Sequence, residues 1–165
     1  MVPTLSRSEA RTRFIDLLND TVYQALGLKE SLEEERKALE SQDLERIEAA
    51  VESKSTCVRN LQALDEKRFQ LCSACGFASA DPEQILQFIK WCDDNELVKN
   101  RWEHLMLIAA EGVALNMTNG AIIRLRQHQF DSSLALLRGV TPGADTYGWN
   151  GEESGSFGRQ SLAEA

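Results

Sequence analysis

The sequence predicts an all-α fold, in which a long antiparallel helical hairpin carries a third long helix packed on it as an elongated bundle. Three observations lead to this prediction. Apolar residues recur at spacings of three and four through most of residues 10–138. Capping residues precede these segments and glycines follow them. The 165 residues, 42% hydrophobic and 27% charged, suit a folded protein with one core.

The first helix is expected to begin near Ser6 or Ser8 and to continue to about residue 40. The Ser6 hydroxyl can accept a hydrogen bond from an early backbone N–H, and Glu9 stands three residues later, as in a capping box. Glu35 fills one position of a heptad-like apolar repeat. The other positions of that repeat are Phe14, Leu18, Thr21, Ala25, Leu28, Leu32 and Leu39.

The second helix is expected to begin after Asp43, a favourable N-cap, and to end at Gly76. Residues 44–75 would span roughly 48 Å as a helix. Because the break after residue 40 is short, the two helices should form an antiparallel hairpin. Lys54 and Arg68 interrupt an otherwise apolar stripe, made of Leu44, Ile47, Val51, Val58, Leu61, Leu64, Leu71 and Cys75.

A shorter helix is expected to start at Pro82. Asp81 can cap it, proline suits its first position, and the acid of Glu83 complements the positive end of the helix dipole. Residues 92–96, Cys-Asp-Asp-Asn-Glu, can kink or recap the chain. The sequence therefore leaves open whether this helix continues into the last one.

The last helix is expected from Glu96 to Arg138, with Gly139 ending it. It carries two apolar stripes, which need two neighbours. The first stripe contains Leu105, Ile108, Gly112, Leu115, Asn119 and Ile122, and the second stripe contains Ile123, Phe130, Leu134 and Leu137. The simplest packing places the first stripe in the groove of the hairpin and leaves the second stripe partly open.

Residues 140–165 change in character and are expected to form a flexible tail. Five glycines stand there among Ser, Glu and Asp residues without periodicity. The rings of Tyr147, Trp149 and Phe157 are unusual for a linker, because exposed aromatic residues are few unless something binds them. The expected organisation is one helical domain, 1–139, followed by a tail, 140–165.

The charge balance indicates which partners and compartments to expect. Eighteen basic and 26 acidic residues give a net charge of −8, which repels nucleic acids and anionic lipids. No basic segment followed by an apolar one opens the chain, and the longest apolar run is Leu105 to Ala110. We expect a cytoplasmic protein without membrane insertion and with four free cysteines in a reducing compartment.

The sequence offers little support for catalysis. Cys72 and Cys75 have the spacing of a redox dithiol, but they fall in the last turn of a helix, where the dipole does not lower a thiol pKa. His104 and His128 lack the further ligands that zinc requires. No glycine-rich phosphate loop precedes a helix. We expect no enzyme, no cofactor and no metal site, and we assign the acidic run of residues 30–35 mainly to a solvated face.

The segment from Asn116 to Ile123 places two amides and a glycine in the middle of a long helix. Glycine there costs about 1 kcal/mol relative to alanine, so a local gain should offset it. One explanation for Gly120 is a close approach of two helices within the fold. The other is a notch for a partner helix, with Asn116 and Asn119 as hydrogen-bonding groups on one face.

The chain resembles the FlgN family of flagellar export chaperones in three places. The corner Leu39-Glu-Ser-Gln-Asp43-Leu44 precedes a charged heptad helix. Asn116-x-x-Asn119-Gly120-x-x-Ile123 follows in the last helix. Ala135-Leu-Leu-Arg-Gly139 is then followed by Tyr147-Gly148. The likeness covers most of residues 10–150.

The resemblance implies a cytoplasmic chaperone that holds the hook-associated proteins FlgK and FlgL before type III export. It places binding of the substrate's C-terminal helix on the late helix, at Asn119, Gly120, Ile123, Phe130, Leu134 and Leu137, to which the helical pattern adds Asn116. It makes Tyr147 the candidate for docking at the export gate protein FlhA. A mobile tail that folds on binding would lower the affinity and help release.

Two other functions remain open from the sequence. The second stripe can serve as a homomeric interface, which would make the chain a self-associating coiled-coil scaffold, such as a homodimer. A helical enzyme with Cys72 and Cys75 as its redox centre is the third hypothesis. Substitution of both cysteines by serine would abolish such an activity, whereas a chaperone would lose only some packing.

Overall fold

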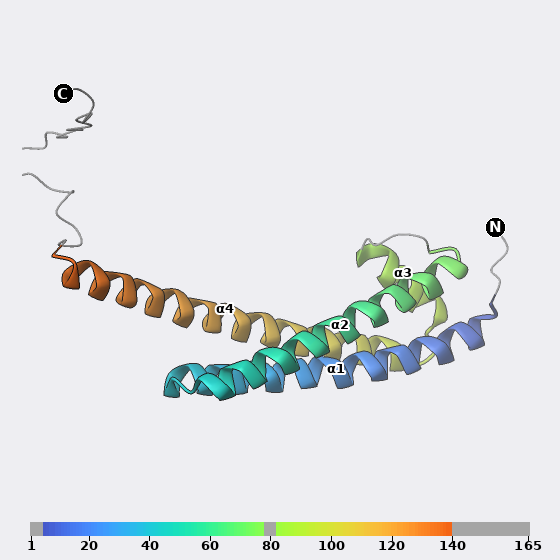
Figure 1. Cartoon of the computed structure of the whole chain (residues 1–165). Coiled ribbons are helices and arrows are strands. Elements are labelled where there is room, and N and C mark those ends of the chain that lie inside the picture. Colours follow the sequence, from blue (N-terminus) through green and yellow to red (C-terminus); the bar gives the residue numbers. More distant parts are fainter. Residues whose placement is uncertain (1–4, 78–81, 140–165) are drawn as a thin grey trace, which may run out of the picture. The chain divides into compact units, whose positions relative to one another are not determined.

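All regular structure in the described part of the chain, residues 5–77 and 82–139 of the computed structural model, is α-helical. The long helices α1, α2 and α4 pack together, which confirms the predicted all-α fold of a hairpin with a third long helix. The elements in chain order are α1 (Arg7–Ser41), α2 (Leu44–Ala74), α3 (Pro82–Cys92) and α4 (Leu97–Leu137), as shown in Figure 1.

The α1–α2 hairpin begins and turns at the residues that the sequence predicts. The Ser6 hydroxyl accepts a hydrogen bond from the Glu9 N–H at 3.3 Å, and the Glu9 carboxylate accepts one from the Ser6 N–H at 3.0 Å. At the corner, Gln42 is left-handed with φ 59°, and the Asp43 carboxylate accepts from the Arg46 N–H at 3.2 Å. Both predicted caps are confirmed, and two residues suffice to reverse the chain.

The core is rich in aromatic rings where α3 packs against the hairpin. Phe88 is fully buried, and its ring centroid lies 4.9 Å from that of Phe14 and 5.5 Å from that of Phe77. Gly76, with φ 90°, ends α2 as predicted, and Pro82 opens α3. Asp81, the expected cap of α3, lies outside the described residues.

The structure answers the question of whether α3 runs on into α4. α3 ends at Cys92, and a new helix begins at Leu97 after Glu96, which has φ 58°. The Asp93 carboxylate accepts a hydrogen bond from the Lys99 N–H at 3.0 Å, so it satisfies a backbone donor in the first turn of α4. An ion pair between Arg7 and Asp94, 2.7 Å long, ties this break to the start of α1.

α4 contacts α1 through its first stripe, but the stripe does not fill the groove of the hairpin as predicted, because its side towards α2 borders an open pocket. Leu105, Ile108 and Asn119 are buried, and the other three positions of the stripe are half-buried. A 2.7 Å ion pair joins Lys29 of α1 to Glu111 of α4. Gly139, with φ 73°, follows the end of α4.

The predicted stripe of α2 is only partly buried. Leu64 and Leu71 belong to the core, but Leu44, Val51 and Val58 are exposed. Leu44 opens α2 directly at the corner, only three residues after the end of α1, so little chain is there to cover it. The predicted stripe is therefore buried mainly in the second half of the helix.

The chain divides into two compact units, one up to Arg124 and one from Leu125 onward, and the boundary falls within α4. Among the residues that the structure describes, all the buried apolar ones belong to the first unit. The domain boundary predicted between residues 139 and 140 stays a prediction, because residues 140–165 lie outside the described part of the chain.

Candidate functional site

A buried polar cluster joins the three long helices of the first unit. Glu35 of α1 is only 2% exposed, and its carboxylate accepts a hydrogen bond from the Lys54 ammonium of α2 at 2.5 Å and one from the Asn119 amide of α4 at 2.7 Å. The Asn119 amide also donates to the Leu32 carbonyl of α1 at 2.9 Å. We call Glu35, Lys54 and Asn119 the polar cluster.

The polar cluster changes two of the sequence interpretations. Glu35 does not share the solvated face of the acidic run, whereas its neighbour Glu34 does and pairs with Lys37 and Arg46 at 2.7 and 3.0 Å. Asn119 is 1% exposed, and its amide nitrogen donates hydrogen bonds to Leu32 and Glu35 of α1. In this structure it therefore holds α4 on α1, and Asn116 is the exposed amide of the pair.

A long groove opens above α1 between α2 and α4. Its volume is about 1120 Å³, more than the ~300–1,000 Å³ typical of small-molecule pockets. The floor is formed by Phe14, Leu17, Leu18, Thr21, Ala25, Leu28 and Leu32 of α1. The α4 wall is formed by Trp102, Leu105, Met106, Ile108, Ala109, Gly112, Val113, Asn116 and Met117. We call this feature the groove; the sequence interpretation did not find it.

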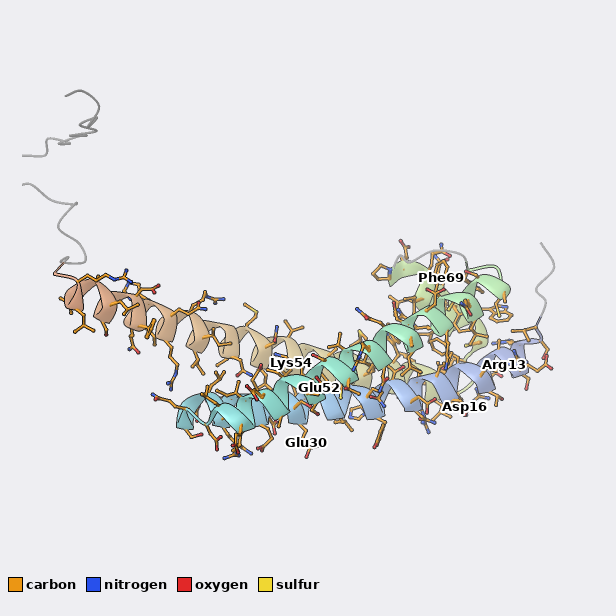
Figure 2. The ribbon with its side chains drawn as sticks, viewed as in Figure 1. Arg13, Asp16, Glu30, Glu52, Lys54 and Phe69 are labelled. Atoms are coloured by element: carbon orange, nitrogen blue, oxygen red, sulfur yellow. The ribbon has the colours of Figure 1, made fainter. Side chains whose placement is uncertain are left out.

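The two walls of the groove differ in chemistry. The α4 wall contains no charged residue, and Met106, Val113 and Met117 on it are exposed. The α2 wall carries charged residues of both signs, with Glu52 and Lys54 visible on this helix in Figure 2. The α2 wall is formed by Glu52, Lys54, Ser55, Val58, Arg59, Leu61, Gln62, Leu64, Asp65, Glu66 and Arg68.

The two interior glycines of α4 are not required for packing within the described fold. A methyl group added at Gly120 would meet only the tip of the Arg124 side chain, at 3.4 Å. One added at Gly112 would have no neighbour within 4 Å. A close approach of two helices within the fold therefore does not explain Gly120. Gly112, which lines the groove, has the same open surroundings.

The second stripe is solvent-accessible at each of its four positions. Phe130 is 64% exposed and Leu137 is 83% exposed, while Ile123 is also exposed and Leu134 is half-buried. In the unit that starts at Leu125, Leu125 and Leu136 add further exposed apolar side chains. This density of exposed large apolar residues is typical of a binding surface.

The cysteines have the properties of packing residues. Burial raises the pKa of the Cys72 and Cys92 thiols to about 11, and it also raises the pKa of Cys75. A redox dithiol needs the opposite shift, because the thiolate is the reactive form. All four cysteines are free, and within residues 5–77 and 82–139 no group of His, Cys, Asp or Glu side chains could hold a metal ion.

α4 is the one helix in the described ranges whose length and composition would allow it to cross a membrane. Its most apolar window has a mean hydropathy of 1.4, and 11% of that window is buried. Core helices of soluble proteins pass the same criterion, which makes it weak evidence. The contacts of Glu111 and Asn119 with α1 belong to a helix that packs within a protein.

The comparison with protein families identifies the chain. The family model described as FlgN protein matches residues 10–155. The chain belongs to the FlgN family. FlgN proteins are flagellar export chaperones that bind flagellar proteins, so this FlgN chain is a chaperone of flagellum biogenesis. Comparisons with curated proteins and with solved structures found no match.

The structure places the predicted site residues of this FlgN chain in different surroundings. Asn116 lines the groove, Asn119 belongs to the polar cluster, and Gly120 and Ile123 lie further along α4 in the same unit. Phe130, Leu134 and Leu137 lie in the second unit. The predicted gate-docking residue, Tyr147, lies outside the described residues. The sequence did not predict the groove, because its floor and two walls come from three different helices. The apolar spacing within one helix does not reveal which of its faces the other helices leave uncovered.

Proposed function

We propose that this FlgN chain is a cytoplasmic type III export chaperone for hook-associated proteins resembling FlgK and FlgL. It binds their C-terminal helices, prevents their premature assembly and delivers them to the export gate. The exposed second stripe is the observation that carries the proposal. A chaperone of this kind must hold an amphipathic helix without covalent chemistry and then release it. The stripe offers apolar side chains that residues 5–77 and 82–139 leave accessible.

The size of the second stripe suits reversible binding. Burial of one large apolar side chain contributes about 1.5–3 kcal/mol, and Phe130, Leu134 and Leu137 together provide a few such contributions. Part of this gain is lost to the ordering of the partner. Gly120 adds a small residue to the proposed surface, and Asn116 adds an exposed amide. Asn119 contributes indirectly, because its hydrogen bond to the Leu32 carbonyl holds α4 on α1.

Delivery is assigned to Tyr147, which we propose as the residue that docks at a gate protein resembling FlhA. This assignment rests on the family resemblance of the Tyr147-Gly148 pair after the last helix. The chain needs no nucleic acid, metal or cofactor for this role. We also propose that it does not insert into a membrane, because α4 makes polar contacts with α1.

The test compares substitutions on the second stripe with one elsewhere. Phe130→Asp and Leu134→Asp should weaken capture of a purified FlgK-like protein in calorimetry and leave the helical circular dichroism unchanged. Tyr23→Asp is the control, because Tyr23 is also an exposed aromatic residue but lies on α1, away from the stripe. If neither stripe substitution changes binding, the assigned surface is wrong.

A further inference from the structure

The groove has the length and openness of a site for another helix. Its α4 wall extends from Trp102 to Met117, about 22 Å or about four helical turns. α1 forms its floor, and α2 and α4 form its two sides, so none of the four helices in the described ranges covers the groove along this length. A small molecule would fill only part of such a space.

The α4 wall would let another helix approach closely, and it would accept different apolar side chains on that helix. Gly112 presents bare backbone to the groove, which lets another helix approach. Met106 and Met117 stand on either side of it, and they are two of the three methionines in the chain. Methionine is flexible and polarisable, so such a wall can adapt to different apolar side chains. This property suits a chaperone that serves more than one substrate.

The α2 wall indicates the charge of the occupant at one point. The Arg59 side chain is 69% exposed, and its ion pair with Glu52 is long, at 3.8 Å, and equally open to solvent. Exposed pairs of this kind contribute little, so Arg59 can exchange Glu52 for a carboxylate on a partner at small cost. Lys54, in contrast, is committed to Glu35 in the polar cluster. Arg59 is therefore the most exposed of the three cations on the α2 wall, because the side chains of Lys54 and Arg68 are only 25% and 24% exposed.

We propose that the groove is a second docking site, for an amphipathic helix of about four turns that belongs to the exported partner. Its apolar face lies on α1 and on the α4 wall, and a carboxylate on its edge faces Arg59. This inference rests on the proposed function. It is separate from the second stripe, since every residue of the groove belongs to the first unit and Phe130, Leu134 and Leu137 belong to the second.

A partner helix fits these observations better than a second copy of the chain. Each copy carries a net charge of −8, so two copies repel each other. A binding mode in which one apolar helix face enters a groove is also common among proteins that recognise helices.

The experiment uses full-length chaperone and a full-length hook-associated protein resembling FlgK. Val113→Glu places a charge on the α4 wall of the groove, where the native side chain is 61% exposed and the fold does not depend on it. Leu107→Glu is the matched control, because Leu107 is equally exposed on α4 but does not line the groove. A photoreactive benzophenone residue at position 113 or 107 reports what lies in the groove, with linked peptides identified by mass spectrometry.

We expect Val113→Glu to weaken binding by roughly tenfold or more, the scale of losing a central apolar contact. We expect Arg59→Glu to weaken it by roughly three- to tenfold, with a larger effect at low salt. Leu107→Glu should leave affinity unchanged, and the benzophenone at position 113 should link to one helical segment of the partner.

The outcomes separate the inference from the proposed function. If Phe130→Asp weakens binding and Val113→Glu does not, the groove is not a docking site, while the chaperone function stands. Cross-links from position 113 to another copy of the chain would overturn the inference in favour of self-association. If the wild-type chain fails to bind any hook-associated protein, the proposed function falls, and the inference falls with it.

Discussion

Glu35 shows how one charged residue can set the arrangement of three helices. A buried carboxylate is unfavourable unless it is paired and hydrogen-bonded, and Glu35 meets this need with Lys54 from α2 and Asn119 from α4. Apolar contacts tolerate small displacements along a helix, whereas these two bonds do not. The polar cluster therefore fixes which turns of α1, α2 and α4 face one another, as a buried polar residue fixes the register of a coiled coil.

Lys54→Met should destabilise the chain because it leaves the Glu35 carboxylate buried without a cation. We expect a loss of about 2–3 kcal/mol in the free energy of unfolding, discounted because the Lys54 side chain is partly exposed. Urea unfolding followed by circular dichroism measures it. Lys37→Met, which removes an exposed partner of Glu34, is the control and should change little. Equal losses in the two variants would contradict a special role for the polar cluster.

The buried thiols should be inert at neutral pH and sensitive to alkali. The pKa of Cys72 rises from its ordinary value of 9.0 to about 11 in the fold because burial disfavours the thiolate. This difference stabilises the fold fully below pH 9, and the contribution is lost as the pH rises towards 11. Alkylation at pH 8, read by mass spectrometry, should modify the half-buried Cys57 before Cys72 and Cys92. Preferential modification of Cys72 would revive the redox hypothesis.

At the scale of the element, α4 is a long helix whose interior contains two glycines, which disfavour helix formation. It spans 41 residues and contains Gly112 and Gly120 in its interior. Neither glycine has a positive φ, and neither has a packed neighbour that a methyl group would displace. Gly76, in contrast, has φ 90° and ends α2, so there glycine is needed for the backbone. The two glycines therefore reduce the stability of the helix, and packing within the described fold does not explain why they are there.

Gly112→Ala and Gly120→Ala should each stabilise the free chain. The expected gain is about 1 kcal/mol from helix propensity, which would raise the melting temperature by about 2–4 °C. Gly76→Ala should lower it, because alanine is strained at that φ. Thermal unfolding by circular dichroism compares the three variants. A loss of stability at position 112 would mean that the groove is narrower than the structure indicates.

At the scale of the whole molecule, the sequence predicted the helices well and their exposed faces less well. Local signals such as the Ser6–Glu9 capping box, the Asp43 cap and Gly76 act within one or two turns, so they can be read from neighbouring residues. The end of α3 was left open because the capping role of Asp93 depends on a helix that begins four residues later. The buried aromatic cluster around Phe88 required the tertiary fold.

The candidate site was predictable only in part, for the same reason. The helical period identified the second stripe, because one helix suffices to define it. The helical period could not show that Asn119 donates a hydrogen bond to Glu35, because these residues are 84 positions apart in the chain. For the same reason it could not show that Val58 and Met117, 59 positions apart, line one groove. The family resemblance located function on the late helix, and the fold adds the surface above α1.

Sedimentation distinguishes the chaperone from the scaffold hypothesis. Because of the net charge of −8, we expect the free chain to sediment as a monomer of 18.5 kDa at physiological salt. A stable dimer that Phe130→Asp dissociates would instead favour the scaffold. Sedimentation with a hook-associated protein should give a heteromeric complex.

The apolar character of the groove also has a thermodynamic consequence. A space of about 1120 Å³ is large enough for tens of water molecules, each taking ~30 Å³ in the liquid, and its lining is mostly hydrocarbon. Their return to bulk when a helix enters should make the heat capacity of association strongly negative. Calorimetry at several temperatures between about 10 and 35 °C should then give a binding enthalpy that becomes steadily more exothermic on warming. Val113→Glu should make the binding enthalpy depend less on temperature.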